Sequence, residues 1–222
     1  MIARRPPVAI SCGEPAGIGP EIAAAAWQTL RGDIPMLWLG AARHLPPDVA
    51  HQIITDPAQA SEVSATALPV LHCDFGAPRT PGTAQPGHAP HVIDMIAQGV
   101  ALVTSGAAAA LTTAPIHKQA LIEGAGFAHP GHTEYLADLA GVKEVVMLLA
   151  APALRVVPVT IHIALEDVPA ALTPAKLRRV IEITHAGLRA RFGIEAPRIA
   201  VAGLNPHAGE GGAMGFQETD WI

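Results

Sequence analysis

The sequence contains few of the residues that mark secreted or nucleic-acid-binding proteins. Only two of its 222 residues are cysteines, Cys12 and Cys73, and they form no CxxC pair. This argues against a disulfide framework and a thiolate zinc site, so a reducing, cytoplasmic location fits best. Charged residues make up 15% of the chain and the net charge is -5. We therefore expect no broad basic surface and no nucleic-acid partner.

Long apolar runs are also absent. The alanine-rich stretches at 23–26 and 107–110 are interrupted by polar residues and glycine, and neither approaches the roughly 18 apolar residues that span a bilayer. We expect no membrane association. Half of the residues are hydrophobic, which is enough for a sizeable core. Aromatic residues are scarce beside eleven histidines, an excess that permits a metal site without establishing one.

Short β-branched runs alternate with alanine-rich helical stretches, which predicts an α/β fold around a mostly parallel sheet. Expected strands are 8–11, 36–39, 69–72, 109–113, 145–150, 155–161 and 198–202, and expected helices are 21–30, 91–105 and 173–192. Residues 56–90 predict irregular or β-rich structure. Thr173 is the expected N-cap of the last helix. Residues 215–222 begin a helical pattern, so we expect the chain to stop inside a domain.

The first candidate motif is the glycine-rich turn GEPAGIGPEI at 13–22, between an expected strand and helix. Backbone N–H groups and the helix dipole at such a turn can hold an anion. The turn lacks the third glycine of the dinucleotide fingerprint and the Lys-Ser/Thr of a P-loop. It serves equally well as a corner that merely reverses the chain.

The second motif is TAPIHKQAL at 113–121, a strand end followed by a helix start that carries Lys118. A lysine at this position can reach a phosphate or carboxylate as a point charge. The alternative is a solvated lysine on a helix face.

The third motif is HPGHTEYLA at 129–137, in which His132 and Thr133 precede an expected helix and so lie at its positive end. An imidazole, a hydroxyl and free backbone N–H groups together suit a phosphate. Thr133 is alternatively no more than the N-cap of that helix.

The fourth candidate is a pair of histidines. His162 ends the run VVPVTIH, and His207 follows RIAVAGLNP. Both come after expected strands, and ligands of open α/β sheets bind at the carboxyl ends of the strands. Convergence of the two imidazoles predicts metal ligation, although each alone is equally a hydrogen-bonded loop residue.

These segments, in this order from Val8 to Ile222, resemble the 4-hydroxythreonine-4-phosphate dehydrogenase family of vitamin B6 biosynthesis. The specific feature is the succession GEPAGIGPEI, TAPIHKQAL, GHTEYLA, TIHIALEDVP and RIAVAGLNPHAGEGG. The resemblance implies a fold similar to isocitrate and isopropylmalate dehydrogenases, with two α/β domains at 1–125 and 126–222, the second incomplete. It also implies an active-site cleft shared between the subunits of a homodimer.

By the same resemblance, His132 and Thr133 contact a phosphorylated hydroxy-acid substrate, and His162 and His207 are two of three histidines that bind zinc, magnesium or cobalt. The third histidine and much of the NAD or NADP surface lie further along the family's chain than Ile222. The implied reaction is oxidation of 4-phosphooxy-L-threonine with decarboxylation to 3-amino-2-oxopropyl phosphate. Lys118 is a candidate for proton transfer or carboxylate binding. We expect this chain alone to be inactive.

Two residues depart from the family's pattern: Glu14 replaces the usual aspartate and His117 the usual asparagine. Because of these two departures, a four-carbon sugar-acid phosphate remains an alternative substrate. A phosphate-acetyltransferase-like acyltransferase is a rival interpretation because it uses a related two-domain scaffold. A non-catalytic binding or dimerisation protein is a third.

Overall fold

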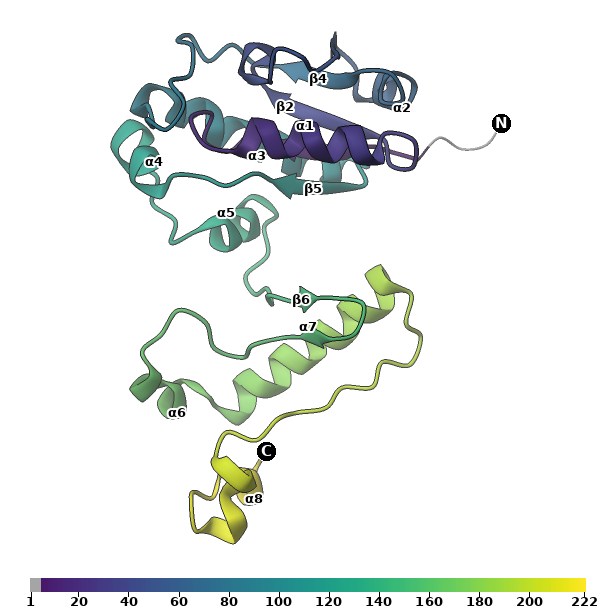
Figure 1. The fold of residues 1–222 in the computed structure, drawn as a ribbon. Coiled ribbons are helices and arrows are strands. Elements are labelled where there is room, and N and C mark those ends of the chain that lie inside the picture. Colours follow the sequence, from purple (N-terminus) through teal and green to yellow (C-terminus); the bar gives the residue numbers. More distant parts are fainter. Residues whose placement is uncertain (1–4) are drawn as a thin grey trace. The chain divides into compact units, whose positions relative to one another are not determined.

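The computed structural model describes residues 5–222 and divides the chain into two compact units, with the division between Lys143 and Glu144 (Figure 1). The domain boundary expected between residues 125 and 126 falls inside the first unit and stays a prediction. No helix in the described part is long and apolar enough to cross a membrane.

The first unit is built on a five-stranded sheet in which every pair of neighbouring strands is parallel. Its strands are β1 (Val8–Ser11), β2 (Met36–Gly40), β3 (His51–Ile54), β4 (Leu68–His72) and β5 (Ala110–Thr113), in the order β3-β4-β2-β1-β5. This confirms the predicted α/β class. β1 is the strand that pairs with both β2 and β5.

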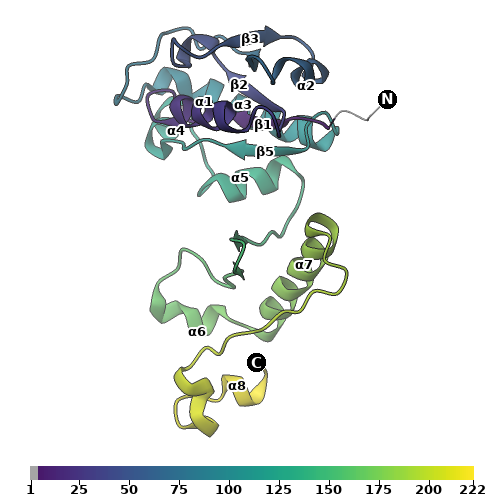
Figure 2. The same cartoon turned by 45° about the vertical axis from the view of Figure 1, so that its right-hand side comes forward.

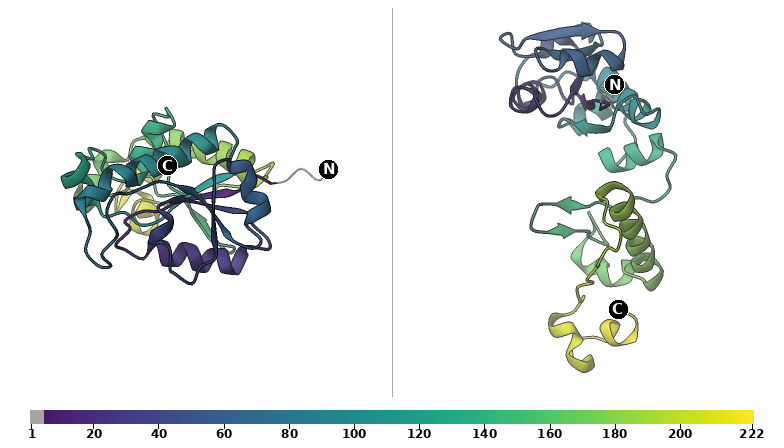
Figure 3. Two further views of the ribbon diagram at one scale, coloured as in Figure 1. Left: turned by 90° about the horizontal axis from the view of Figure 1, so that it is seen from above. Right: turned by 90° about the vertical axis from the view of Figure 1, so that its right-hand side faces the viewer.

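The helices of the first unit are α1 (Gly19–Leu30), α2 (Ala60–Val63), α3 (Ala89–Thr104), α4 (Lys118–Ala125) and α5 (His132–Leu139), with short 3-10 turns η1 (Ala42–His44), η2 (Pro57–Gln59) and η3 (Pro86–His88). α1 and α3 cover opposite faces of the sheet (Figure 3, left). α5 lies on the β5 side of the sheet and packs against α3 (Figure 2).

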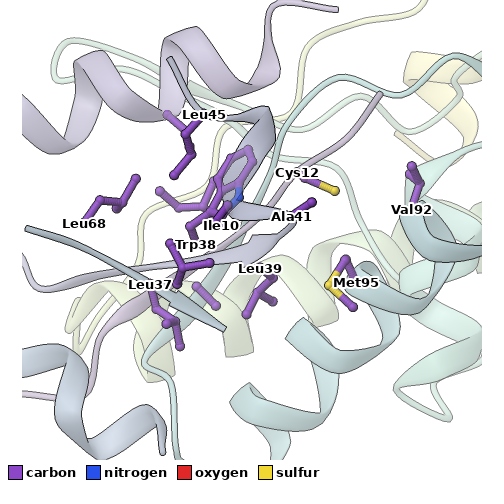
Figure 4. Close-up of a cluster of buried hydrophobic side chains, with 14 of the residues drawn as sticks. Ile10, Cys12, Leu37, Trp38, Leu39, Ala41, Leu45, Leu68, Val92 and Met95 are labelled. Carbon is purple, nitrogen blue, oxygen red and sulfur yellow. The ribbon is translucent and has the colours of Figure 1, made fainter. Parts of the chain in front are cut away.

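The core of the first unit lies around β2, whose five residues are all buried. Leu37, Trp38 and Leu39 are fully inaccessible to solvent, and Val92 and Met95 of α3 lie in the same cluster (Figure 4). Trp27 of α1 also belongs to this cluster. Burial on both faces is the pattern of a central parallel strand. Each such side chain contributes roughly 1.5–3 kcal/mol through loss of contact with water.

The second unit contains one long helix, α7 (Pro174–Phe192), and short elements around it. Thr173 is its N-cap, as predicted, since the hydroxyl of Thr173 accepts a hydrogen bond from the Lys176 amide at 3.2 Å. The other elements are β6 (Leu149–Ala150), β7 (Arg155–Val156), η4 (Leu165–Asp167), α6 (Val168–Ala171), η5 (Pro206–Gly212) and α8 (Gln217–Asp220).

Strand prediction fails mainly in the second unit. The segments expected at 145–150 and 155–161 do pair, but only as a two-residue antiparallel ladder. The segment 198–202 forms no strand, so that prediction is wrong. A β-strand needs a neighbour to hydrogen-bond its backbone, and 198–202 pairs with no strand in residues 5–222. Val201 is accordingly 44% exposed.

A buried histidine beside the sheet makes the stability of the first unit depend on pH. His44 is fully buried, with its ring 5.1 Å from that of Phe75 and 5.5 Å from that of His88. Burial lowers the pKa of His44 to about 4, and repulsion from His88, Arg43 and Arg79 acts in the same direction. The folded protein therefore holds His44 neutral at pH values where the unfolded chain is protonated.

We predict that the free energy of unfolding is at its full value above pH 6.5 and decreases as the pH falls toward about 4, by up to about 3 kcal/mol. The unfolded state binds the extra proton in this range, so acid favours unfolding. Urea unfolding followed by the fluorescence of the buried Trp27 and Trp38 measures the effect. His44→Phe should flatten the dependence, whereas the exposed His51→Gln control should not. Equal slopes in both variants would contradict the assignment.

Candidate functional site

The first two motifs lie side by side at the carboxyl edge of the sheet. β1 and β5 are neighbours in register, with Ser11 opposite Thr113, so the segments that follow them leave the sheet together. The Glu14 amide donates a hydrogen bond to the Pro115 carbonyl at 2.8 Å. The chain passes from β1 to the strands on one side and returns to β5 on the other. This is the topological switch point where ligands of open α/β sheets bind.

The glycine-rich turn is shaped by close packing against the neighbouring loop. Gly13 has φ +63°, and a Cβ there would collide with the Pro115 carbonyl. A Cβ on Gly19 would lie 2.5 Å from the Cys12 carbonyl. The Glu14 carboxylate is buried and accepts a hydrogen bond from the Ala16 amide at 2.9 Å. These contacts support the interpretation of the turn as a tightly packed corner.

Arg79 forms hydrogen bonds with this turn and with the helix that follows it. It lies in residues 56–90, where the sequence analysis identified no motif. Its guanidinium donates to the Pro15 carbonyl at 3.1 Å and to the Glu21 carboxylate at 2.7 Å. The hydrogen bond from Arg79 lowers the pKa of Glu21. Residues 56–90 have no periodic pattern, and no local signal in the sequence connects Arg79 with a turn more than sixty positions earlier.

Lys118 is the first residue of α4 and its side chain is exposed. The preceding His117 is the N-cap, with Nδ1 accepting a hydrogen bond from the Ala120 amide at 3.2 Å. Within the described residues no hydrogen bond or ion pair joins Lys118 to His132 or Thr133. Its predicted catalytic role therefore stays a prediction, and the solvated lysine stays the alternative.

The structure places His132 and Thr133 in the first turn of α5. The N-cap is Gly131, which has no side chain to satisfy the first amides of the helix. His132 and Thr133 are the first and second helical residues. Thr133 is therefore not the N-cap, and that alternative is wrong. An uncapped helix start presents free N–H groups to an anion.

His132 carries a polar atom that lacks a partner. Its Nε2 is buried and, within residues 5–222, accepts or donates no hydrogen bond. Burial also lowers the pKa of His132. A buried nitrogen without a partner costs about 1–3 kcal/mol, and a bound phosphate oxygen would remove that cost. The role of His132 in binding phosphate stays a prediction.

One charge opposes anion binding at this position. Glu134 lies in the first turn of α5, and its Oε2 is 3.4 Å from where a Cβ on Gly131 would lie. The carboxylate is thus drawn toward the positive end of the helix. An incoming phosphate would have to displace it or share the site with it.

The predicted metal histidines adopt an unusual backbone conformation. In residues 5–222, four residues other than glycine have positive φ: His162, His207, Ala208 and Glu210. His162 and His207 have φ 56° and 52°, and both are exposed. Nδ1 of His207 lies 2.9 Å from the Glu210 carboxylate, a contact that leaves Nε2 available. Residues in this sparsely populated region are concentrated at functional sites.

The described residues hold no group of three or more histidine, cysteine or acidic side chains that could bind a metal ion. His162 and His207 as a pair are below that number, so their predicted role stays a prediction. A surface depression lined by Arg5, Asp56, Glu62 and Gly106 includes none of the candidate residues.

A parallel sheet covered by helices, with glycine-rich, histidine and lysine segments following β1 and β5, places the chain among α/β proteins, a class that includes many dehydrogenases. Residues 25–222 match the family described as pyridoxal phosphate biosynthetic protein PdxA. The chain belongs to this family, whose named relatives are 4-hydroxythreonine-4-phosphate dehydrogenases.

The relative from Roseobacter denitrificans is 65% identical over 217 residues, covering 97% of this chain and 67% of the relative. The one from Ruegeria sp. is 64% identical, covering 97% and 66%. The crystal structure of 4-hydroxythreonine-4-phosphate dehydrogenase from Klebsiella pneumoniae superimposes with a TM-score of 0.87 at 35% identity, covering 100% of this chain and 69% of that one. The chain therefore spans about two thirds of the length of these relatives.

If the first turn of α5 binds an anion, Glu134→Gln should increase the affinity for inorganic phosphate roughly two- to five-fold, because a competing negative charge is removed. Equilibrium titration calorimetry measures this. The exposed Glu195→Gln in the second unit is the charge-matched control. An identical gain in both variants would show that only net charge matters.

Proposed function

We propose that the chain forms part of an NAD- or NADP-dependent dehydrogenase that oxidises 4-phosphooxy-L-threonine, with decarboxylation to 3-amino-2-oxopropyl phosphate. The observation that carries the proposal is the start of α5, which no side chain caps and whose first turn carries His132 and Thr133. Family membership supplies the substrate and the reaction class. The proposal includes an isocitrate-dehydrogenase-like arrangement of two domains, a homodimer with a shared active site and a cytoplasmic location.

In this proposal the first turn of α5 holds the substrate phosphate. The first amides of α5 have no capping side chain, and the hydroxyl of Thr133 and the imidazole of His132 add two further hydrogen-bonding groups. The phosphate takes no part in bond breaking, so its binding energy serves to orient the reacting carbon. The unpaired His132 nitrogen favours a ligand that fills the site.

His162 and His207 are the proposed ligands of the divalent metal, with a third ligand from outside the chain. Two imidazoles suit zinc or cobalt, and the carboxylate of Glu210 beside His207 Nδ1 is the usual outer partner that fixes the tautomer of a ligating histidine. When bound, the metal would act as a Lewis acid toward the substrate hydroxyl. The positive φ of both histidines supports a shared, specialised role.

Lys118 is proposed for substrate carboxylate binding or proton transfer from the start of α4. Its exposed ammonium group is compatible with either role. No described residue is proposed for the nicotinamide cofactor, since the glycine-rich turn at 13–19 lacks the dinucleotide fingerprint and is packed against the loop after β5.

The two departures from the family's pattern have local structural roles. The Glu14 carboxylate closes the glycine turn onto the Ala16 amide, and the His117 ring caps α4. Aspartate and asparagine are suited to the same two tasks. Neither substitution is therefore an argument for a different substrate, and 4-phosphooxy-L-threonine remains the proposed one.

The reaction is tested by NADH or NADPH formation on 4-phosphooxy-L-threonine and on four-carbon sugar-acid phosphates. The protein is assayed alone and as an extended protein, joined to the part of the Roseobacter denitrificans relative that the match with this chain does not cover. We expect activity with 4-phosphooxy-L-threonine in the extended protein. Preferential oxidation of a sugar-acid phosphate would favour the alternative substrate. Acyl transfer from an acyl phosphate without nicotinamide reduction would favour the acyltransferase.

The metal role predicts that His162→Ala and His207→Ala each abolish retention of zinc or cobalt by the extended protein, while the fold is kept because both side chains are exposed. Metal content after dialysis and far-ultraviolet circular dichroism measure the two properties. His185→Ala, on α7, is the control. A variant that retains metal at the wild-type ratio removes that histidine from the ligand set.

A further inference from the structure

Helix α5, which carries His132 and Thr133, is attached to the first unit by few contacts. Tyr135 is its one buried residue, with 8% of its surface exposed. The Tyr135 hydroxyl donates a long hydrogen bond of 3.4 Å to the Ile93 carbonyl in α3. Because α5 has only eight residues and no side-chain cap, its intrinsic stability is low. Its direction must be fixed by packing.

Three aromatic rings contribute to that packing, in addition to Leu136, which packs against the core. The ring centroid of Tyr135 lies 5.3 Å from that of Phe127, in an edge-to-face arrangement, and 5.0 Å from that of His129. The Phe127 and His129 rings are 5.3 Å apart, so all three are in mutual contact. Phe127 and His129 precede the turn that leads into α5, whereas Tyr135 follows it. The cluster therefore ties the two ends of the turn together.

His129 joins the two ends in a second way. Its Nε2 lies 3.9 Å from the Asp138 carboxylate, on the last turn of α5. The His129 side chain is 30% exposed, unlike the buried Phe127 and Tyr135. Losing the His129 ring should therefore cost little of the hydrophobic core, while removing a contact that bridges the turn.

We propose that His129 is a positioning residue that holds the first turn of α5, and so His132 and Thr133, in the geometry that binds the substrate phosphate. The inference rests on the proposed function. Between His129 and His132 the chain contains only Pro130 and the N-cap Gly131, and glycine is the residue with the greatest backbone freedom. A small rotation about Gly131 would carry the His132 ring away from the phosphate.

The test uses the 222-residue protein and inorganic phosphate as the probe, with affinity from titration calorimetry and thermal unfolding as a separate readout. His129→Ala should weaken phosphate binding roughly three- to ten-fold. His129→Phe, which restores a ring, should recover most of the affinity. The exposed His51→Ala on β3 is the control and should bind as the wild type does. In the extended enzyme, His129→Ala should raise KM and lower kcat/KM by at least the factor lost in phosphate affinity.

A purely structural role would lower the unfolding temperature of His129→Ala without changing phosphate affinity in the folded protein, and that result overturns the inference. If the alanine variant does not fold, His129→Leu replaces it. Equal phosphate affinity of the leucine and phenylalanine variants would show that the ring is not needed, and would also overturn the inference. His132→Ala separates the two proposals. If the wild type binds phosphate no better than His132→Ala, the proposed phosphate site is wrong, and the positioning role is overturned with it.

Discussion

The arrangement of the first unit depends on the parallel pairing of β1 with β2 on one side and β5 on the other. Parallel neighbours bring their carboxyl ends to one edge, so the segments that follow β1 and β5 must pack against each other. Glycines at 13 and 19 permit this close approach of the two segments. The hydrogen bond from the Glu14 amide to the Pro115 carbonyl joins them. Lys118, His132 and Thr133 all come after β5 in the sequence, so they follow the chain's exit from this edge of the sheet.

The candidate residues differ in whether groups of the protein already satisfy their hydrogen bonds. Glu14 and His117 have satisfied hydrogen bonds with nearby backbone amides, and both serve the local fold. His132 is the opposite case, because its Nε2 is buried without a partner at the start of a helix that no side chain caps. The other buried side-chain atoms without a partner in residues 5–222 belong to Ser11, Trp38, His44 and His88, none of which is a candidate residue. The contrast singles out α5 among the motifs of the first unit.

The sequence predicted most of the first unit because its elements are strongly patterned. Strand 8–11 agrees with the structure residue for residue, and in the second unit so does the N-cap at Thr173. β3 was missed because its sequence, HQII, has two polar residues and three exposed positions, so it carries no burial signal. The strand at 198–202 was wrong because apolar β-branched residues predict a strand only where a neighbour exists to pair with it. Long-range contacts such as that from Arg79 to Pro15 leave no local pattern at all.

For the site, the sequence identified the residues but not their surroundings. Motif spacing placed His132 near a helix start, yet only the structure shows that Gly131 takes the N-cap and leaves Thr133 inside the helix. The left-handed backbone of His162 and His207 was likewise not predicted, because histidine, although enriched among the non-glycine residues with positive φ, adopts that conformation only rarely. The rings of Phe127, His129 and Tyr135 come together through a turn that no periodicity describes.

The start of α5 is proposed to be a phosphate site at which ligand binding favours the protonated form of His132. Nuclear magnetic resonance titration of the His132 ring, with and without saturating inorganic phosphate, tests it most directly. Burial predicts a pKa below the usual value of 6.5 in the free protein, and a bound phosphate dianion should raise it by favouring the imidazolium. A pKa of His132 that is unchanged by saturating phosphate would contradict the account.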